Sequence, residues 1–289
     1  MPPSNKKHLI LNGHQYECGK ALFTHENRAF RYGDGLFETI RCHKTIPLFF
    51  DQHYDRLIRG MAILKLSVAD LPGPDMFKSY IERLIVRNRI FYDARVRISV
   101  FRRSGGLYTP ENNRPAWLIE ATPLPNKGFL LNDRGLKIGT FDGFPKAWSL
   151  TAPFKTLSAT PYILAGIYKK ENHLDDCLIL NQNKKWIETI SSNLFWTKDQ
   201  VLYTPSVAAG CVDGIMRKQV LRFAALNNIP AKETTGATKE ELLNADELFL
   251  SNAIQGIQWV VAFENKRYYN RLPKVITQWL NEEISKITS

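Results

Sequence analysis

A glutamate inside a short apolar strand is the first residue whose setting indicates chemistry. Residues 186–190 (WIETI) alternate as a strand does, so Glu188 shares one face with Trp186 and Ile190. A carboxylate directed into an apolar surface needs a partner, because burying an unpaired charge is costly. The alternative is an edge strand whose face lies in water, where the same glutamate would be an ordinary surface residue.

Two other segments have the features of anion sites. Residues 211–217 (CVDGIMR) form a loop that opens a helix, and the backbone N–H groups of Ile215 and Met216 lie at the positive end of its dipole. Arg56 lies in an expected helix, and the planar fork of its guanidinium matches the geometry of a phosphate. Taken alone, residues 211–217 could be an ordinary helix start that binds nothing, and Arg56 could be an ordinary solvated helix arginine.

Lys155 could act as a nucleophile. It stands in residues 152–157 (APFKTL), and an apolar neighbourhood lowers the pKa of a lysine amine and so favours Schiff-base chemistry. The chain contains 39 lysines and arginines, so one lysine is no evidence by itself. Its interpretation depends on the residues that accompany it.

Short strands and amphipathic helices must position these residues. The first half alternates between apolar strands and two helices, one expected to be capped by Asp51 and one to follow Pro74. In the second half we expect a helix from Thr160 with Pro161 in its first turn, and another capped by Asp213. The expected strands cover residues 8–12, 37–42, 96–100, 117–121, 136–140, 177–180, 186–190, 194–196 and 201–203.

The length of 289 residues exceeds one average domain. Residues 122–126 (TPLPN) contain two prolines one residue apart, which favours an extended, unpaired stretch. We therefore expect an N-terminal α/β domain at 1–121, a linker at 122–127 and a C-terminal domain at 128–289.

Composition excludes several classes of protein. With 44% apolar and 23% charged residues the chain is typical of folded, soluble proteins. Its four cysteines are far apart, which indicates reduced thiols in the cytoplasm and no metal site. No apolar stretch has the length of a signal peptide or membrane span. The net charge of +11 is spread along the chain without a nucleic-acid motif, so a basic module that binds nucleic acid or protein is a remote alternative.

The motifs occur together in an order that resembles the fold-type-IV enzymes that use pyridoxal 5′-phosphate (PLP), the class IV aminotransferase family. The likeness spans nearly the whole chain. It rests on residues 31–41 (RYGDGLFETIR), His53-x-x-Arg56, Lys155, Glu188, 192–196 (SNLFW), 203–205 (YTP), 214–217 (GIMR), 245–247 (ADE) and 251–253 (SNA). The resemblance implies a D-amino acid aminotransferase-like fold, with a small N-terminal α/β sandwich domain and a larger C-terminal mixed α/β domain.

The resemblance also implies roles for individual residues. Lys155 would hold PLP in a Schiff base and move protons, while Glu188 would bind the pyridine nitrogen. Arg56 and the backbone N–H groups of Ile215 and Met216 would bind the phosphate. A homodimer acting on a small amino substrate is implied as well.

The chain departs from branched-chain aminotransferases at two positions. Thr160 stands where those enzymes carry a tyrosine, with Tyr162 two residues further on. Ala253 stands where they carry a phosphate-binding threonine, so we expect Ser251 or Asn252 to replace that contact.

Other local features are closer to aminodeoxychorismate lyase, which forms 4-aminobenzoate and pyruvate. Thr39 matches a threonine beside the active site of the lyase, and residues 101–106 (FRRSGG) are similar to one of its loops. Arg102 in this loop could bind a substrate carboxylate. We therefore expect a lyase, and the alternative is an amino acid aminotransferase of the branched-chain or D-amino acid type.

Overall fold

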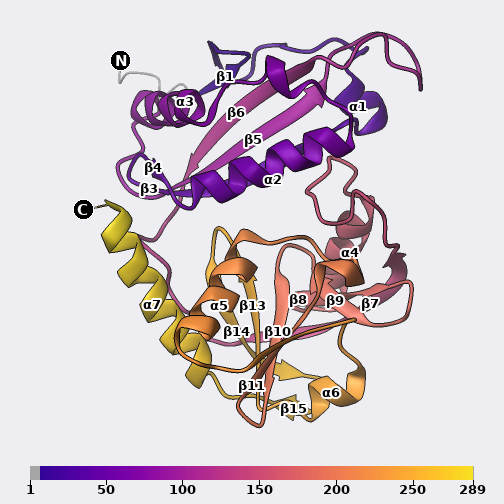
Figure 1. Cartoon of the computed structure of the whole chain (residues 1–289), viewed down its shortest axis with the longest axis vertical. Helices are drawn as coiled ribbons and strands as arrows, with labels where there is room; N and C mark the ends of the chain where they lie inside the picture. Colours follow the sequence, from indigo (N-terminus) through magenta and orange to yellow (C-terminus); the bar gives the residue numbers. More distant parts are fainter. Residues whose placement is uncertain (1–6, 289) are drawn as a thin grey trace. The chain divides into compact units, whose positions relative to one another are not determined.

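The computed structural model describes residues 7–288, which form two compact units (Figure 1). The first six residues of the expected N-terminal domain lie outside the described part. Among the described residues, the first unit comprises 7–128, Phe154–Ser158 and 287–288, and the second comprises Phe129–Pro153 and Ala159–Lys286. The architecture is mixed α/β, as expected.

The expected domain boundaries need correction in two places. Thr122 and Pro123 belong to a strand, because they pair with Arg95 and Ala94, so the linker does not begin at 122. Residues 154–158 belong to the first unit because they pair with one of its strands: the Phe37 N–H donates to the Lys155 carbonyl at 2.8 Å. The second unit is therefore not continuous from 128.

The first unit is built on a six-stranded antiparallel sheet with the order β2-β1-β6-β5-β3-β4. Its strands are β1 (His8–Leu11), β2 (His14–Glu17), β3 (Gly35–His43), β4 (Ile46–Pro47), β5 (Ala94–Arg102) and β6 (Pro115–Pro123). Its helices are α1 (Arg28–Tyr32), α2 (Phe50–Ile63), the 3-10 turn η1 (Val68–Asp70) and α3 (Pro74–Arg87). Helices α2 and α3 pack on one face of this sheet (Figure 1).

The pattern of apolar residues explains how α2 and α3 bind the sheet. Leu57 and Met61 of α2 and Phe77 and Ile81 of α3 recur at helical spacing and are fully buried against the strands. Asp51 does not cap α2, in contrast to the expectation. The N-cap position is Phe49, which has a φ of 54° and makes no side-chain capping hydrogen bond to the described residues.

The second unit contains a nine-stranded mixed sheet with the order β12-β11-β10-β13-β14-β7-β8-β9, and β15 pairs with β14. Strand β9 also pairs with β10 through Glu188 and Asn193, which closes a ring of six strands. Its strands are β7 (Leu136–Lys146), β8 (Asp176–Asn181), β9 (Trp186–Thr189), β10 (Asn193–Lys198), β11 (Val201–Pro205), β12 (Ala231–Thr234), β13 (Glu247–Asn252), β14 (Gly256–Phe263) and β15 (Lys266–Arg267). Its helices are α4 (Thr160–Glu171), the 3-10 turn η2 (Val207–Ala209), α5 (Ile215–Leu226), α6 (Lys239–Leu243) and α7 (Arg271–Thr288).

The two helices expected in this unit are present, but their first residues differ from the expectation. Helix α4 begins at Thr160 itself, with Ala159 at the N-cap position. Helix α5 has Gly214 as its N-cap, and Asp213 instead pairs with Lys218 at 3.0 Å. The N-cap residue of α5, a glycine, therefore supplies no side-chain capping hydrogen bond.

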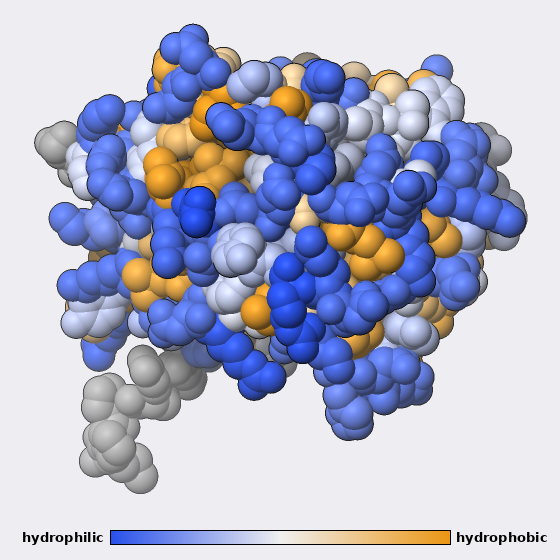
Figure 2. All heavy atoms as spheres, turned by 90° about the horizontal axis from the view of Figure 1, so that it is seen from below, coloured by the Kyte–Doolittle hydropathy of each residue, from blue (hydrophilic) through white to orange (hydrophobic). Residues whose placement is uncertain are grey.

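The surface of the described residues is mostly hydrophilic on the face drawn in Figure 2, where hydrophobic residues form separate small patches. Within residues 7–288, none of the helices combines the length and apolar character that crossing a bilayer requires.

Candidate active site

Glu188 lies in the interior of the second unit, on β9, with only 2% of its surface exposed. One carboxylate oxygen, Oε1, accepts hydrogen bonds from Lys146 Nζ and from the Tyr162 hydroxyl, both at 2.7 Å. The other oxygen, Oε2, accepts from the Val212 backbone N–H at 2.8 Å. The partner that a buried carboxylate requires is thus present, and it includes a lysine that the sequence analysis did not identify.

The negative charge of Glu188 controls the protonation of its neighbours. Burial and then this charge raise the pKa of Tyr162 well above its ordinary value. Burial and the same carboxylate raise the pKa of Cys211 to about 12. At neutral pH the phenol and the thiol therefore keep their protons, and Tyr162 is a hydrogen-bond donor to Glu188.

The N-terminus of α5 forms a cradle whose dimensions require glycine at position 214. A Cβ there would lie well inside 3.0 Å of the Asn193 side-chain oxygen. Asn193 is itself fixed, because its amide donates to the Val212 carbonyl at 2.8 Å. Ile215 and Met216, which begin the helix, are buried, and their N–H groups belong to the first turn, which has no intrahelical acceptor.

Ser251 adds a hydroxyl beside this cradle. It is opposite Asn193 in the pairing of β13 with β10 and is 1% exposed. Its Oγ has no hydrogen-bond partner among the described residues, which is unusual for a buried hydroxyl. Asn252 differs, because its side-chain oxygen accepts from the N–H groups of Ile254 and Gln255 and so holds a turn. Of the two expected substitutes for the threonine, Ser251 therefore has the geometry that fits a phosphate.

We expect Gly214→Ala to destabilise the second unit, because the added methyl group must displace Asn193 and break its bond to Val212. The loss should be about 1–3 kcal/mol in the free energy of unfolding, measured by urea denaturation. Gly166→Ala in α4 is the matched control: a Cβ there meets nothing within 4 Å, so the change should stabilise the helix by about 0.5–1 kcal/mol. Equal effects of the two substitutions would contradict this account of the cradle.

Lys155 lies in the first unit, on a short segment that extends the sheet beside the start of β3. Leu36 and Thr156 form an antiparallel bridge, so Lys155 is opposite Phe37. Lys155 Nζ lies 4.8 Å from the centre of the Phe37 ring, and the Arg97 guanidinium lies 3.6 Å from that centre. Thr39 pairs with Arg97 and shares this sheet face with Phe37, because strand residues two apart point the same way. The face opposite α2 and α3 therefore brings together Lys155, Arg97, Phe37 and Thr39.

Arg97 was not identified from the sequence as a site residue. It lies in the alternating strand of residues 94–102, where an arginine on the polar face is typical of a solvated position. Burial lowers the pKa of Arg97, the charge of Glu120 opposes this shift, and the charge of Arg95 adds to it. The Arg97 Nε donates to the Ser99 hydroxyl at 3.1 Å. A cation that has lost part of its hydration and lies near a lysine is well placed to bind an anion.

Arg56 has a carboxylate partner in the first unit. Its Nε and Nη2 donate to the two oxygens of Glu38 at 2.8 and 2.6 Å, and His53 Nδ1 lies 2.6 Å from the same carboxylate. All three side chains are almost completely buried. Arg56 is thus not the solvated helix arginine of the simpler interpretation, and this bidentate pair fixes the direction of its guanidinium.

The buried pair also determines how the first unit responds to acid. Burial alone would raise the pKa of Glu38, but the charge of Arg56 and the hydrogen bonds from His53 and Arg56 outweigh it and hold that pKa at about 2. Burial lowers the pKa of His53, and Glu38 offsets this only in part. The folded state therefore favours an ionised Glu38 and a neutral His53.

We expect Glu38→Gln to lower the free energy of unfolding by about 3–5 kcal/mol, because it leaves the buried Arg56 without its counter-ion. The contribution of Glu38 is present above its ordinary pKa of 4.5 and is lost as the pH falls towards 2. Urea unfolding between pH 3 and 7 should show this loss in the wild type and not in the variant. Asp55→Asn, which removes an exposed pair with Arg59, should change stability by less than about 1 kcal/mol at every pH.

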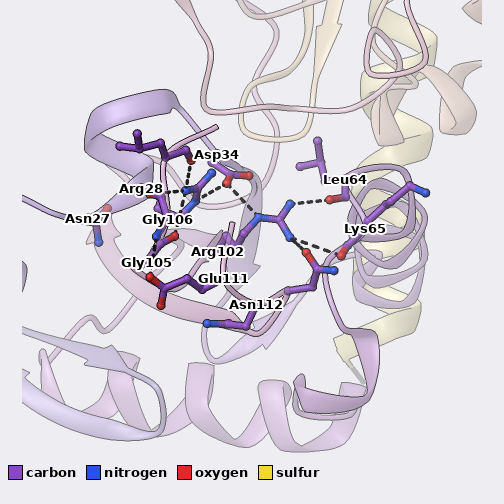
Figure 3. A network of polar contacts seen from close by, with 12 residues as sticks. Asn27, Arg28, Asp34, Leu64, Lys65, Arg102, Gly105, Gly106, Glu111 and Asn112 are labelled. Atoms are coloured by element: carbon purple, nitrogen blue, oxygen red, sulfur yellow. Dashed lines mark hydrogen bonds and ion pairs between the residues drawn. The ribbon is translucent and has the colours of Figure 1, made fainter. Parts of the chain in front are cut away.

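The expectation that Arg102 binds a substrate carboxylate needs correction, because the donors of its guanidinium are engaged within the protein (Figure 3). Its Nε donates to Asp34 at 2.9 Å and its Nη2 to the Leu64 carbonyl at 2.6 Å, while Nη1 binds Asn113. Arg28 donates to the same Asp34 oxygen and to the Leu107 carbonyl. Arg102 is 6% exposed, so it anchors the loop after β5 and is not placed to bind a substrate.

The chain connects Lys155 to the second unit over two residues. The Pro153 carbonyl accepts a hydrogen bond from the Asp213 N–H at 2.9 Å, directly before the Gly214 cradle. The Ala152 carbonyl accepts from Lys146 Nζ at 3.2 Å. The residues that precede Lys155 are therefore held by groups that neighbour Glu188 and the start of α5.

Comparison with known proteins identifies the family of the chain. Residues 35–263 match the model of the amino-transferase class IV family. The chain is 27% identical over 245 residues to aminodeoxychorismate lyase of Vibrio harveyi, which covers 83% of this chain and 88% of that protein. It is 28% identical over 282 residues to a putative branched-chain-amino-acid aminotransferase of Methanocaldococcus jannaschii, covering 96% of each.

The fold agrees as well. The structure of a branched-chain aminotransferase from Thermoproteus uzoniensis superposes with a TM-score of 0.87 at 21% identity, covering 96% of this chain and 94% of that one. This confirms the fold-type-IV architecture expected from the sequence motifs. The orphaned Ser251 hydroxyl and the glycine cradle also fit the phosphate of the cofactor that this family uses. The chain therefore belongs to the class IV aminotransferase family of PLP-dependent enzymes.

Proposed function

We propose that the chain is an aminodeoxychorismate lyase. The observation that carries this proposal is the position of Thr39, which shares a sheet face with Phe37 and the Lys155 ammonium. The lyase must break a C–O bond and give a proton to the released enolpyruvate, and a hydroxyl on this face could assist that transfer. The similarity to the Vibrio harveyi lyase supports the same choice.

Lys155 has two roles in the proposed reaction. Lys155 would hold the cofactor covalently and then accept the proton from the amine-bearing carbon of the substrate. Loss of that proton and of the enolpyruvate leaving group makes the substrate ring aromatic, which yields 4-aminobenzoate. Protonation of the released enolpyruvate yields pyruvate. The bound cofactor supplies a conjugated ring that accepts electrons from the substrate carbon.

The remaining residues would hold the cofactor. Glu188 would bind the pyridine nitrogen, since its carboxylate is fixed by Lys146, Tyr162 and Val212. The phosphate would lie at the start of α5, on the N–H groups of Ile215 and Met216 and the hydroxyl of Ser251. Arg56, oriented by Glu38, would add a charge-assisted contact. Asn252 would support this site through its turn and its bond to Ser192.

We propose Arg97, in place of Arg102, as the residue that binds a substrate carboxylate. Arg97→Met should raise the KM about 10- to 100-fold through loss of a charge-assisted contact, with little change in the unfolding midpoint. Arg102→Met is the control. It breaks the bonds to Asp34 and Leu64, so its main effect should be a lower unfolding midpoint and not a higher KM. Steady-state kinetics with thermal unfolding separate the two. An unchanged KM in a folded Arg97→Met enzyme would contradict the assignment.

An amino acid aminotransferase is the second candidate, favoured by the similarity to the Methanocaldococcus jannaschii protein over 96% of the chain. The deciding experiment incubates the enzyme with aminodeoxychorismate and follows 4-aminobenzoate, with amino acids plus 2-oxoglutarate in parallel. Glutamate without 4-aminobenzoate would overturn the lyase proposal. Reduction with borohydride followed by peptide mapping should place the cofactor on Lys155 and not on Lys146.

We also propose a homodimer in the cytoplasm. Large apolar side chains are exposed along α4 and the segment before it, and their burial in a partner would explain them. They are Phe144, Trp148, Leu150, Ile163, Leu164 and Ile167. Light scattering should give twice the chain mass, and Ile163→Glu should shift the protein to monomer. The free thiols of the described cysteines are consistent with a reducing compartment.

A further inference from the structure

Lys146 contacts Glu188, and neither the family motifs nor the proposed reaction assigns it a role. We infer that Lys146 is a positioning residue, the counter-ion that keeps Glu188 ionised and correctly oriented in the protein before the cofactor binds. Its importance for the cofactor rests on the proposed function. Its pairing with Glu188 can be tested without any cofactor.

The geometry gives Lys146 a direct effect on the charge of Glu188. Lys146 Nζ is 2.7 Å from Glu188 Oε1, and their side chains are only 13% and 3% exposed. Because water screens this pair so little, removing one charge would leave the other uncompensated. Lys146 also fixes the direction of the carboxylate, since Oε1 meets Lys146 and Tyr162 while Oε2 meets Val212.

The other titratable groups around Glu188 cannot replace this cation. Tyr162 of α4 and Cys211 of the loop before α5 face the carboxylate, and both keep their protons at neutral pH because their pKa values are raised. Arg217 and Asp213 act on Cys211 from further along that segment, with opposite charges. Among the described residues, Lys146 is therefore the cation in contact with Glu188.

A second contact connects Lys146 to the segment that carries Lys155. Its ammonium donates to the Ala152 carbonyl at 3.2 Å, three residues before Lys155. Lys146 therefore donates both to Glu188, the carboxylate proposed to bind the ring nitrogen, and to the backbone three residues before Lys155. Lys146 is the last residue of β7, after a register shift between Phe141 and Lys146.

The test is a double-mutant cycle on the cofactor-free protein, with Lys146→Met, Lys146→Arg and Glu188→Gln. Without its cation, Glu188 should have a raised pKa in the folded state, so the Lys146→Met protein binds an extra proton at low pH. Between the ordinary pKa of a glutamate in the unfolded chain and the raised pKa in the folded variant, the folded protein holds a proton that the unfolded chain has lost. The stability of the Lys146→Met protein should therefore fall as the pH rises through this range. The loss in unfolding midpoint relative to wild type should therefore be larger at pH 8 than at pH 5, and about 5 °C or more.

The conservative variants separate charge from packing. Lys146→Arg should keep the wild-type pH profile. Lys146→Met should not destabilise the Glu188→Gln protein, because the ammonium has already lost its counter-ion there. The inference is overturned if Lys146→Met costs the same in both backgrounds without pH dependence, or if Lys146→Arg restores nothing.

A cofactor-binding measurement gives the second readout. Fluorescence titration of the apoprotein with PLP should show about tenfold weaker binding for Lys146→Met, restored by Lys146→Arg. Unchanged affinity would contradict the role of Lys146 towards the cofactor. If the wild type itself fails to bind PLP, the proposed function is wrong, whereas the stability cycle still decides whether Lys146 holds Glu188.

Discussion

Lys155→Ala should abolish covalent attachment of PLP and lower the turnover number at least about 10³-fold. Two functions are lost together, since the same amine would hold the cofactor and transfer the substrate proton. The structure should be preserved, because Lys155 contributes its backbone carbonyl to the pairing with Phe37, which alanine retains. Single-turnover kinetics and the absorbance of the reconstituted protein measure the two losses separately.

Lys274→Ala on the exposed side of α7 is a suitable control, because it removes an amine from a surface helix. It should leave both measurements unchanged. A Lys155→Ala enzyme that retains a tenth of the wild-type rate would contradict the assignment and would direct attention to Lys146. Added methylamine should restore part of the lost proton transfer in Lys155→Ala if the missing group is an amine.

The two-residue period placed Glu188 on one strand face with Trp186 and Ile190, but left open whether that face is buried or in water. In the structure all four residues of β9 are buried. The same period predicted the half-buried strand around Val96, and helical spacing predicted the apolar faces of α2 and α3. These patterns are local, and each residue contributes to a face that its own neighbours define. The fold class followed from their order along the chain, together with the family motifs.

Lys146 could not be predicted in this way. It follows a register irregularity in β7, so no period indicates which way its side chain points. Its partner Glu188 is 42 residues away along the chain. Such a pair becomes visible only when β7 and β9 are placed in space, because both flank β8 in the sheet.

The misassigned residues show a related limit. Arg102 and Arg97 are both arginines of β5, and sequence alone does not show which one has its donors engaged by Asp34 and backbone carbonyls. Asp51 and Asp213 are typical capping residues. The N-cap positions of α2 and α5 are instead Phe49, which has a positive φ, and Gly214, which the Asn193 side chain approaches closely.

Glu188→Gln is the second substitution with a large expected effect, and it should lower the turnover number about 10²- to 10³-fold. The amide keeps the shape of the side chain but carries no charge to stabilise a protonated ring nitrogen, a loss comparable to removing one preorganised electrostatic contact. The KM should change less, because the substrate carboxylate is proposed to bind Arg97. A fall in kcat with a stable KM is therefore the expected signature.

The same change should also destabilise the cofactor-free protein, because Lys146 would remain poorly exposed without its counter-ion. The expected cost is about 3 kcal/mol in the free energy of unfolding, and Lys146→Met should recover part of it in the double variant. Glu264→Gln removes an exposed pair with Lys239 and should change both quantities little. If Glu188→Gln lost activity without losing stability, the carboxylate would serve the cofactor alone, and its bond to Lys146 would contribute nothing to the folded state.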